Sequence, residues 1–204
     1  MELFSKEFIM GYFSRNKKFL LVSLAIFLIT FVISAIIAYI NIGNQYGLIT
    51  ATVVRSHVSP ISGFNMSAWD LFSHNFSVDV GVILFGFLFS IVSVILVLYN
   101  AFLIGAPFGS DFIFAALTII PHSIIEYPAS VVALVGAFLI TRIEIDIIKS
   151  FSYRDVSVGD VIRQSNTKIK DIVLSFIFMT VLLVIAALVE AYLTPVIFNA
   201  FFGF

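Results

Sequence analysis

The chain has no cysteine among its 204 residues, and only 11% of its residues are charged. Without cysteine it can form neither a disulfide framework nor a thiolate metal site. An ordinary soluble domain carries about 25% charged residues, so these charges are too few to cover a water-soluble globule. With 61% hydrophobic residues and a mean hydropathy of +1.13, the composition indicates an integral membrane protein whose main partner is the lipid bilayer.

The sequence also lacks the signatures of common soluble enzymes. It contains no HExxH zinc motif, no Walker A loop, no GxSxG elbow and no dinucleotide-binding fingerprint. Its basic segment, residues 142–170, has no aromatic interleaving or recognition motif, so nucleic acid is not an expected partner. That segment is typical of a cytoplasmic connector attracted to anionic headgroups.

Long uncharged stretches predict an all-α fold, a polytopic helical membrane bundle of about five passes. The whole chain, 1–204, forms one transmembrane domain. We expect an interfacial cytoplasmic helix at 1–18, a span at 19–40, an external loop at 41–77, a span at 78–104, a broken or re-entrant hairpin at 111–141, a cytoplasmic connector at 142–170 and a last span at 171–198.

Lysine and arginine placement predicts the orientation. The N-terminal segment carries four of these residues, the 41–77 loop one, and the 142–170 segment six. Positive residues favour the cytoplasmic side, which places the N-terminus inside and the C-terminus outside. Residues 111–141 then begin and end inside. Because they are too few for two full crossings of about 20 residues each, we predict a hairpin that bends near Pro121.

Three ionisable residues inside the spans form the candidate site. His122 and Glu126 lie four residues apart on one helix face, and Glu190 lies 20 residues beyond Lys170, about 30 Å along a helix. We therefore expect all three to converge in the outer half of the membrane. His74 and Asn75 mark the outer end of the second span, where they would close the site from above, and Asn100 is a further candidate hydrogen-bond partner.

The chemistry of this site has three interpretations. Glu126 can be a structural carboxyl bonded to His122, Tyr127 or Asn100, because burial favours the neutral form. The set His122, Glu126 and Glu190 can bind a divalent metal such as zinc. A catalytic or proton-relay role is the third.

Several of these residues carry a resemblance to a known family. The chain resembles the stage II sporulation protein M family in Arg15-Asn-Lys-Lys18 before the first span and in Asn75, Asn100 and Gly105 around the second. The resemblance continues through Pro121-His122, Glu126, Pro128-Ala129, Gly136 and Glu190-Ala-Tyr-Leu-Thr-Pro195. It departs at Ala101 and Ser123, where the family often has glycine.

The resemblance implies a multispan protein of a prokaryotic plasma membrane that works in a complex. The function expected first is non-enzymatic: the chain organises or anchors partners, as a homo-oligomer or with other membrane proteins. One alternative is an intramembrane metal-dependent hydrolase using His122, Glu126 and Glu190. The second is a transporter or channel subunit, with a water path along the small and polar residues of the spans.

Overall fold

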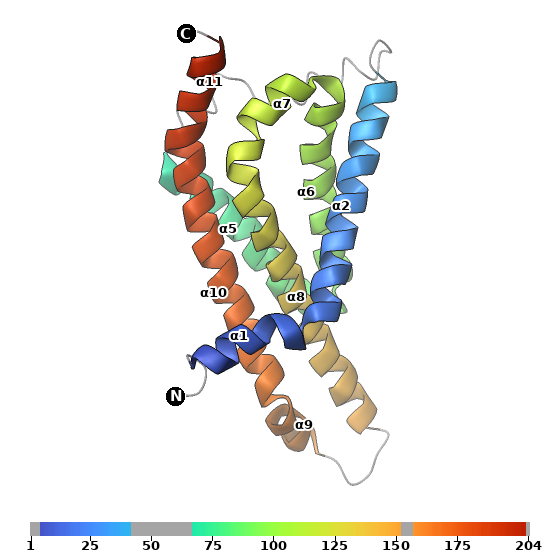
Figure 1. Cartoon of the computed structure of the whole chain (residues 1–204). Helices are drawn as coiled ribbons and strands as arrows, with labels where there is room; N and C mark the ends of the chain where they lie inside the picture. Colours follow the sequence, from blue (N-terminus) through green and yellow to red (C-terminus); the bar gives the residue numbers. More distant parts are fainter. Residues whose placement is uncertain (1–4, 42–66, 152–156, 203–204) are drawn as a thin grey trace.

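The computed structural model describes residues 5–41, 67–151 and 157–202, and every regular element in these ranges is a helix. The predicted all-α helical bundle is confirmed (Figure 1). Four of the described helical stretches are long and apolar enough to cross a membrane: Lys17–Ile40, Ala68–Leu88, Ile91–Ser110 and Asn166–Phe201. Residues 42–66, most of the predicted external loop, lie outside the described residues.

The first helix, α1 (Lys6–Arg15), lies crosswise to the long helices, some of which extend beyond it (Figure 1). It begins at Ser5, whose hydroxyl oxygen accepts a hydrogen bond of 3.2 Å from the Phe8 amide. The chain then turns at Asn16 into α2 (Lys17–Ile40), the first predicted span. The placement of α1 suits a helix at the membrane surface, because α1 lies crosswise to the long helices.

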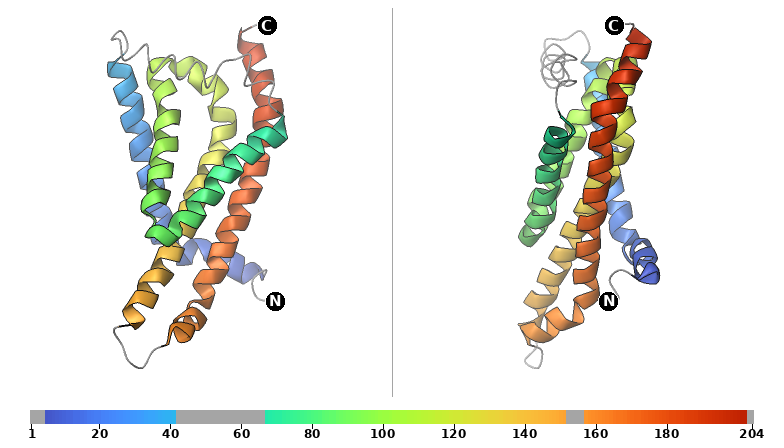
Figure 2. Two further views of the ribbon diagram at one scale, coloured as in Figure 1. Left: turned by 180° about the vertical axis from the view of Figure 1, so that it is seen from behind. Right: turned by 90° about the vertical axis from the view of Figure 1, so that its left-hand side faces the viewer.

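A helical hairpin follows, and its position differs from the prediction. Helix α5 (Ala68–Leu84) and the short 3₁₀ helix η2 (Phe85–Leu88) lead into a turn, after which α6 (Ile91–Ser110) runs back. The two long helices diverge from the turn as a V (Figure 2). Helix α5 therefore begins within the predicted external loop 41–77, and the predicted single span 78–104 consists of parts of two helices that meet at a turn.

The turn uses two residues in the left-handed backbone region. Phe89 has φ 51° and Ser90 has φ 55°, a conformation that side chains other than glycine seldom adopt. Hydroxyl groups satisfy the backbone here: Thr141 donates to the Gly86 carbonyl (2.9 Å), and Ser90 then donates to the Thr141 oxygen (2.6 Å). Ser93 donates to the Val82 carbonyl (2.7 Å). In an apolar environment, the backbone groups that a helix break frees must find other hydrogen-bond partners, and these hydroxyl groups supply them.

The predicted break near Pro121 is present, between two helices, but the two arms do not form a hairpin. Helix α7 (Phe112–Thr118) crosses the end of the bundle opposite α1, and α8 (Ile120–Ser150) then runs without interruption back past α1 (Figure 1). Pro121 lies in the first turn of α8, where a missing N–H costs nothing, so it starts the helix and does not bend a hairpin. Pro128 lies inside α8 and does not end it.

The chain ends with α9 (Val158–Gln164), α10 (Asn166–Leu188), the π-helical turn η3 (Val189–Leu193) and α11 (Thr194–Phe202). Ser157 caps α9 by accepting a hydrogen bond from the Asp160 amide (3.1 Å). Helix α1 and the 142–170 segment lie toward one end of the bundle and the C-terminus toward the other (Figure 1). Which end is cytoplasmic stays a prediction.

Small residues let α2 and α6 pack closely. A Cβ atom on Gly105 would overlap the backbone carbonyl of Phe31, and one on Gly109 would overlap that of Ala35. Between these contacts Ser34 donates a hydrogen bond of 2.5 Å to the Phe102 carbonyl. In lipid, helices associate through such close packing and interhelical hydrogen bonds, and the other long pair, α8 and α10, also runs in extended contact.

Candidate functional site

The start of α8 and the π-helical turn η3 bring together the three predicted side chains. His122 and Glu126 occupy successive turns of α8, and Glu190 is the second residue of η3. One ligand atom from each of the three lies within 4.8 Å of the other two. The predicted convergence is therefore confirmed, whereas its depth in a membrane stays a prediction.

The distances leave a gap at the centre of this group. His122 Nε2 lies 4.0 Å from Glu126 Oε2 and 4.0 Å from Glu190 Oε1. These separations are too long for hydrogen bonds. Ligand atoms about 2.0–2.2 Å from a zinc ion lie roughly 3.4 Å apart in tetrahedral geometry, so small side-chain movements would close the three residues around a metal ion.

The π-helical turn places Glu190. Pro195 has no N–H to donate to the preceding turn, and the helix widens over Val189–Leu193 just before it. The Thr194 hydroxyl donates to the Val189 carbonyl (3.4 Å) inside this widened turn. Single π turns of this kind are frequent at functional sites, and this one contacts both α5 and α8.

The site is only partly shielded. The side chains of His122, Glu126 and Glu190 retain 13%, 17% and 27% of their exposure. Two polar atoms beside them, His122 Nδ1 and the Tyr127 hydroxyl, are buried without a hydrogen-bond partner among the described residues. The interpretation in which Tyr127 holds Glu126 through a hydrogen bond is thus not supported by the geometry.

Sequence reasoning missed one buried carboxyl near this group. Asp79 on α5 is 2% exposed, and both its oxygens accept from the Ser130 hydroxyl, at 2.9 and 3.2 Å. It interacts electrostatically with Glu126. The available signal was an isolated carboxyl at the start of a long uncharged run, and the structure places Asp79 well inside helix α5.

No basic side chain is available to neutralise these carboxyl groups. Between Phe19 and Thr141 the described residues include no lysine or arginine. Glu126 and Glu190 therefore have only the His122 imidazole between them, and charged carboxylates in such a place are costly without a cation. The site can accordingly hold protons or a divalent metal ion.

The remaining predicted residues stand apart from the three. His74 is exposed on α5, and Asn75 and Asn100 are half-buried on α5 and α6. None of these side chains makes a hydrogen bond with His122, Glu126 or Glu190 in the described part of the chain. Their part in closing the site stays a prediction.

Comparison with known proteins adds the family. Residues 23–195 match the stage II sporulation protein M family, and this range includes all three converging residues. The chain belongs to that family. No curated protein and no solved structure was found to match it. This stage II sporulation protein M family member thus has its three-residue group inside the region that defines the family.

Proposed function

We propose that this family member anchors partner proteins in a membrane complex, and that a divalent cation held by His122, Glu126 and Glu190 fixes the bundle that presents them. The observation that carries the proposal is the convergence of one ligand atom from each residue within 4.8 Å. Family membership supports the membrane component, and the geometry supports the metal.

The charge balance explains why a cation belongs here. A divalent ion would offset two carboxylates at once. No side chain between Phe19 and Thr141 of the described residues can do this, because His122 carries at most one positive charge and this range includes no lysine or arginine. One imidazole and two carboxylates form a nitrogen and oxygen set suited to zinc or another divalent ion. Such an ion would tie α8 to the π-helical turn before α11 and so stiffen that end of the bundle.

Metal content and stability test the proposal together. Purified full-length protein should carry one divalent metal ion per chain by elemental mass spectrometry, and Glu126→Gln or Glu190→Gln should lose it. The control is Glu7→Gln, which removes an exposed carboxylate from α1. At a metal concentration of 100 times the Kd, chelation should lower the free energy of unfolding by about 2.7 kcal/mol. The proposal would be contradicted if the purified wild-type protein contained no metal ion and chelation did not change its free energy of unfolding.

A metal-dependent hydrolase is the second candidate, and one observation favours it. Three protein ligands leave a fourth position for water, the arrangement of catalytic zinc sites, and the partial exposure of the three side chains lets water reach it. If the protein anchors partners, Glu190→Gln should reduce the size of the complex that contains this protein in native membranes. For a hydrolase the complex should keep its size while an uncut substrate accumulates. The transporter alternative stays a prediction.

A further inference from the structure

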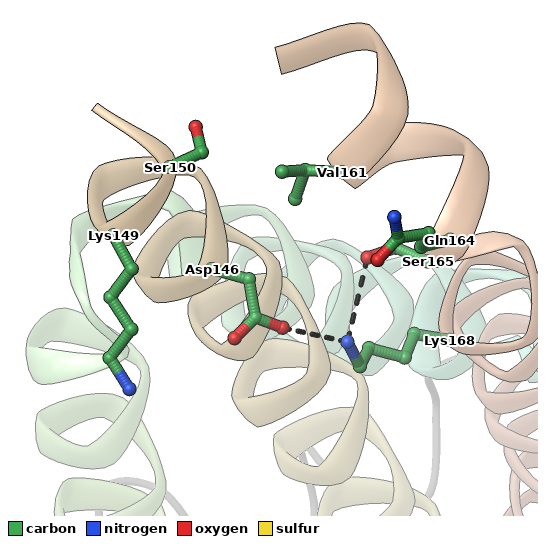
Figure 3. Close-up of a pocket in the computed structure, with 7 residues that line it drawn as sticks. All are labelled: Asp146, Lys149, Ser150, Val161, Gln164, Ser165 and Lys168. Atoms are coloured by element: carbon green, nitrogen blue, oxygen red, sulfur yellow. Dashed lines mark hydrogen bonds and ion pairs between the residues drawn. The ribbon is translucent and has the colours of Figure 1, made fainter. Parts of the chain in front are cut away.

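A polar cavity lies at the end of the bundle that carries α9, well away from the carboxylate site. Its volume is about 300 Å³, and it opens where the last turns of α8, helix α9 and the start of α10 meet (Figure 3). Its lining is almost entirely polar: Asp146, Lys149, Ser150, Val161, Gln164, Ser165 and Lys168.

Positive charge exceeds negative charge around this cavity. The only carboxylate in the lining, Asp146, already receives two cations: Lys168 Nζ lies 2.7 Å from its Oδ2, and Arg142 Nε lies 3.9 Å from its Oδ1. Lys149 has no carboxylate partner among the described residues. Asp146 lies between the two lysines: Lys168 points toward it, whereas the Lys149 side chain extends to the other side with its ammonium group free of any described carboxylate (Figure 3).

Neutral donors supplement the lysines. The Gln164 amide makes no hydrogen bond with any described residue, and the Ser165 hydroxyl oxygen accepts from Lys168 (3.5 Å) while its own proton stays free. The Ser150 hydroxyl is already used, because it donates to the Ile147 carbonyl (2.7 Å). The free donors and the unbalanced ammonium charge thus line one cavity, and such groups are the chemistry that recognises an oxyanion.

We propose that this cavity binds a phosphate group, carried by an anionic phospholipid or free in solution. Basic pockets between helices at a membrane surface hold phospholipid headgroups, and about 300 Å³ accommodates a phosphate with its glycerol. Exposed apolar side chains flank the lining residues: Ile148 is 52%, Phe151 75% and Ile162 46% exposed. They provide a surface for acyl chains beside the phosphate site.

Native mass spectrometry of the full chain in detergent tests this proposal, with phosphatidylglycerol, phosphatidylcholine and inorganic phosphate as probes. A lysine near an anionic headgroup contributes about 1 kcal/mol, so Lys149→Gln and Lys168→Gln should each weaken phosphatidylglycerol binding about fivefold. Lys18→Gln removes an exposed lysine outside the cavity and should leave the affinity within about twofold. Equal losses of affinity in all three variants would overturn the proposal. It would also be overturned if the protein bound phosphatidylglycerol no more tightly than phosphatidylcholine and bound no inorganic phosphate.

The probes distinguish the sources of the phosphate. Phosphatidylglycerol bound tightly without competition from inorganic phosphate assigns the site to a lipid, and phosphate bound alone assigns it to a soluble anion. Because Lys168→Gln also releases Asp146, Gln164→Ala serves as a variant that disturbs no ion pair, and it should weaken the bound probe about threefold for one lost hydrogen bond. Unchanged affinity in Gln164→Ala and Lys149→Gln alike would overturn the proposal. Glu126→Gln should leave this binding unchanged, so the metal proposal can fail independently.

Discussion

Arg15 on α1 and Asp171 on α10 form an ion pair, and we predict that removing the arginine destabilises the protein more than removing the aspartate. The Asp171 side chain is 3% exposed, whereas that of Arg15 is 30% exposed. Asp171 accepts hydrogen bonds from Arg15 Nε (3.1 Å), Arg15 Nη2 (2.5 Å) and Asn16 Nδ2 (2.9 Å). Removing the arginine therefore leaves a buried carboxylate with one amide partner, while removing the aspartate leaves an arginine that can reach water or headgroups.

We expect Arg15→Ala to lower the free energy of unfolding by about 3–5 kcal/mol, the cost of leaving a buried charge unpaired. Asp171→Ala should cost only about 1.5–3 kcal/mol, the range for lost hydrogen bonds to a charged group. The double variant should cost less than the sum of the two, because the buried charge is gone. Lys17→Ala, two residues along the chain and exposed, is the control and should change little.

Unfolding in a detergent titration gives these free energies, and amide hydrogen exchange over Lys6–Arg15 reports whether α1 detaches. Arg15→Ala should speed exchange throughout α1, because Asp171 then no longer holds the helix. The reasoning is refuted if Asp171→Ala costs as much as Arg15→Ala, or if the two losses simply add. Either result would mean that burial of Asp171 does not determine the energetics of this contact.

Three further predictions follow from other parts of the fold. Burial raises the pKa of Tyr12 to about 12 from an ordinary 10.0, against the hydrogen bond between its hydroxyl and that of Ser175 and with a smaller contribution from the charge of Asp171. The folded state thus favours the neutral phenol, so this stabilisation should be complete below pH 10 and lost toward pH 12, and the Tyr12→Phe variant should lack this pH dependence of stability. Gly105→Ala should lower the free energy of unfolding by about 1–3 kcal/mol, because the new methyl group overpacks α2 against α6. In the same thermal unfolding assay Gly81→Ala should be neutral or stabilising, because its new Cβ meets nothing closer than 3.9 Å. A cysteine at Lys149 in this cysteine-free chain should react with a membrane-impermeant maleimide only in inside-out vesicles, and labelling from the outside of intact cells would contradict the predicted orientation.

The parts of the fold that regular helix geometry determines were predictable from sequence. The spacing of His122 and Glu126, together with the helical distance from Lys170 to Glu190, was enough to predict that the three residues converge. The cap at Ser157 was predictable for the same reason, since its partner Asp160 is local. Such features depend on residues a few positions apart or on a constant rise per residue.

The hairpin was not predictable because its turn has no sequence signature. Glycine is the usual residue at positive φ, yet this turn uses Phe89 and Ser90 and depends on Thr141, 51 residues from Ser90. The break that Pro121 suggested does lie beside it, between α7 and α8, whereas Pro128 is tolerated within α8. The partners of Asp171 and Asp79 were missed for the same reason, since Arg15 and Ser130 become neighbours only in the folded chain.

The π-helical turn has a consequence for how this protein tolerates insertions and deletions. A π turn of this kind is equivalent to one extra residue inserted into an α-helix. Deleting one residue between Val189 and Leu193 would restore a continuous α-helix from α10 into α11, and because the widened turn absorbs the extra residue, α11 would keep its orientation. The buried face of α11, which includes Phe198, would keep its neighbours, whereas deleting a residue from the regular helix of α11 before Phe198 would rotate that face by about 100°.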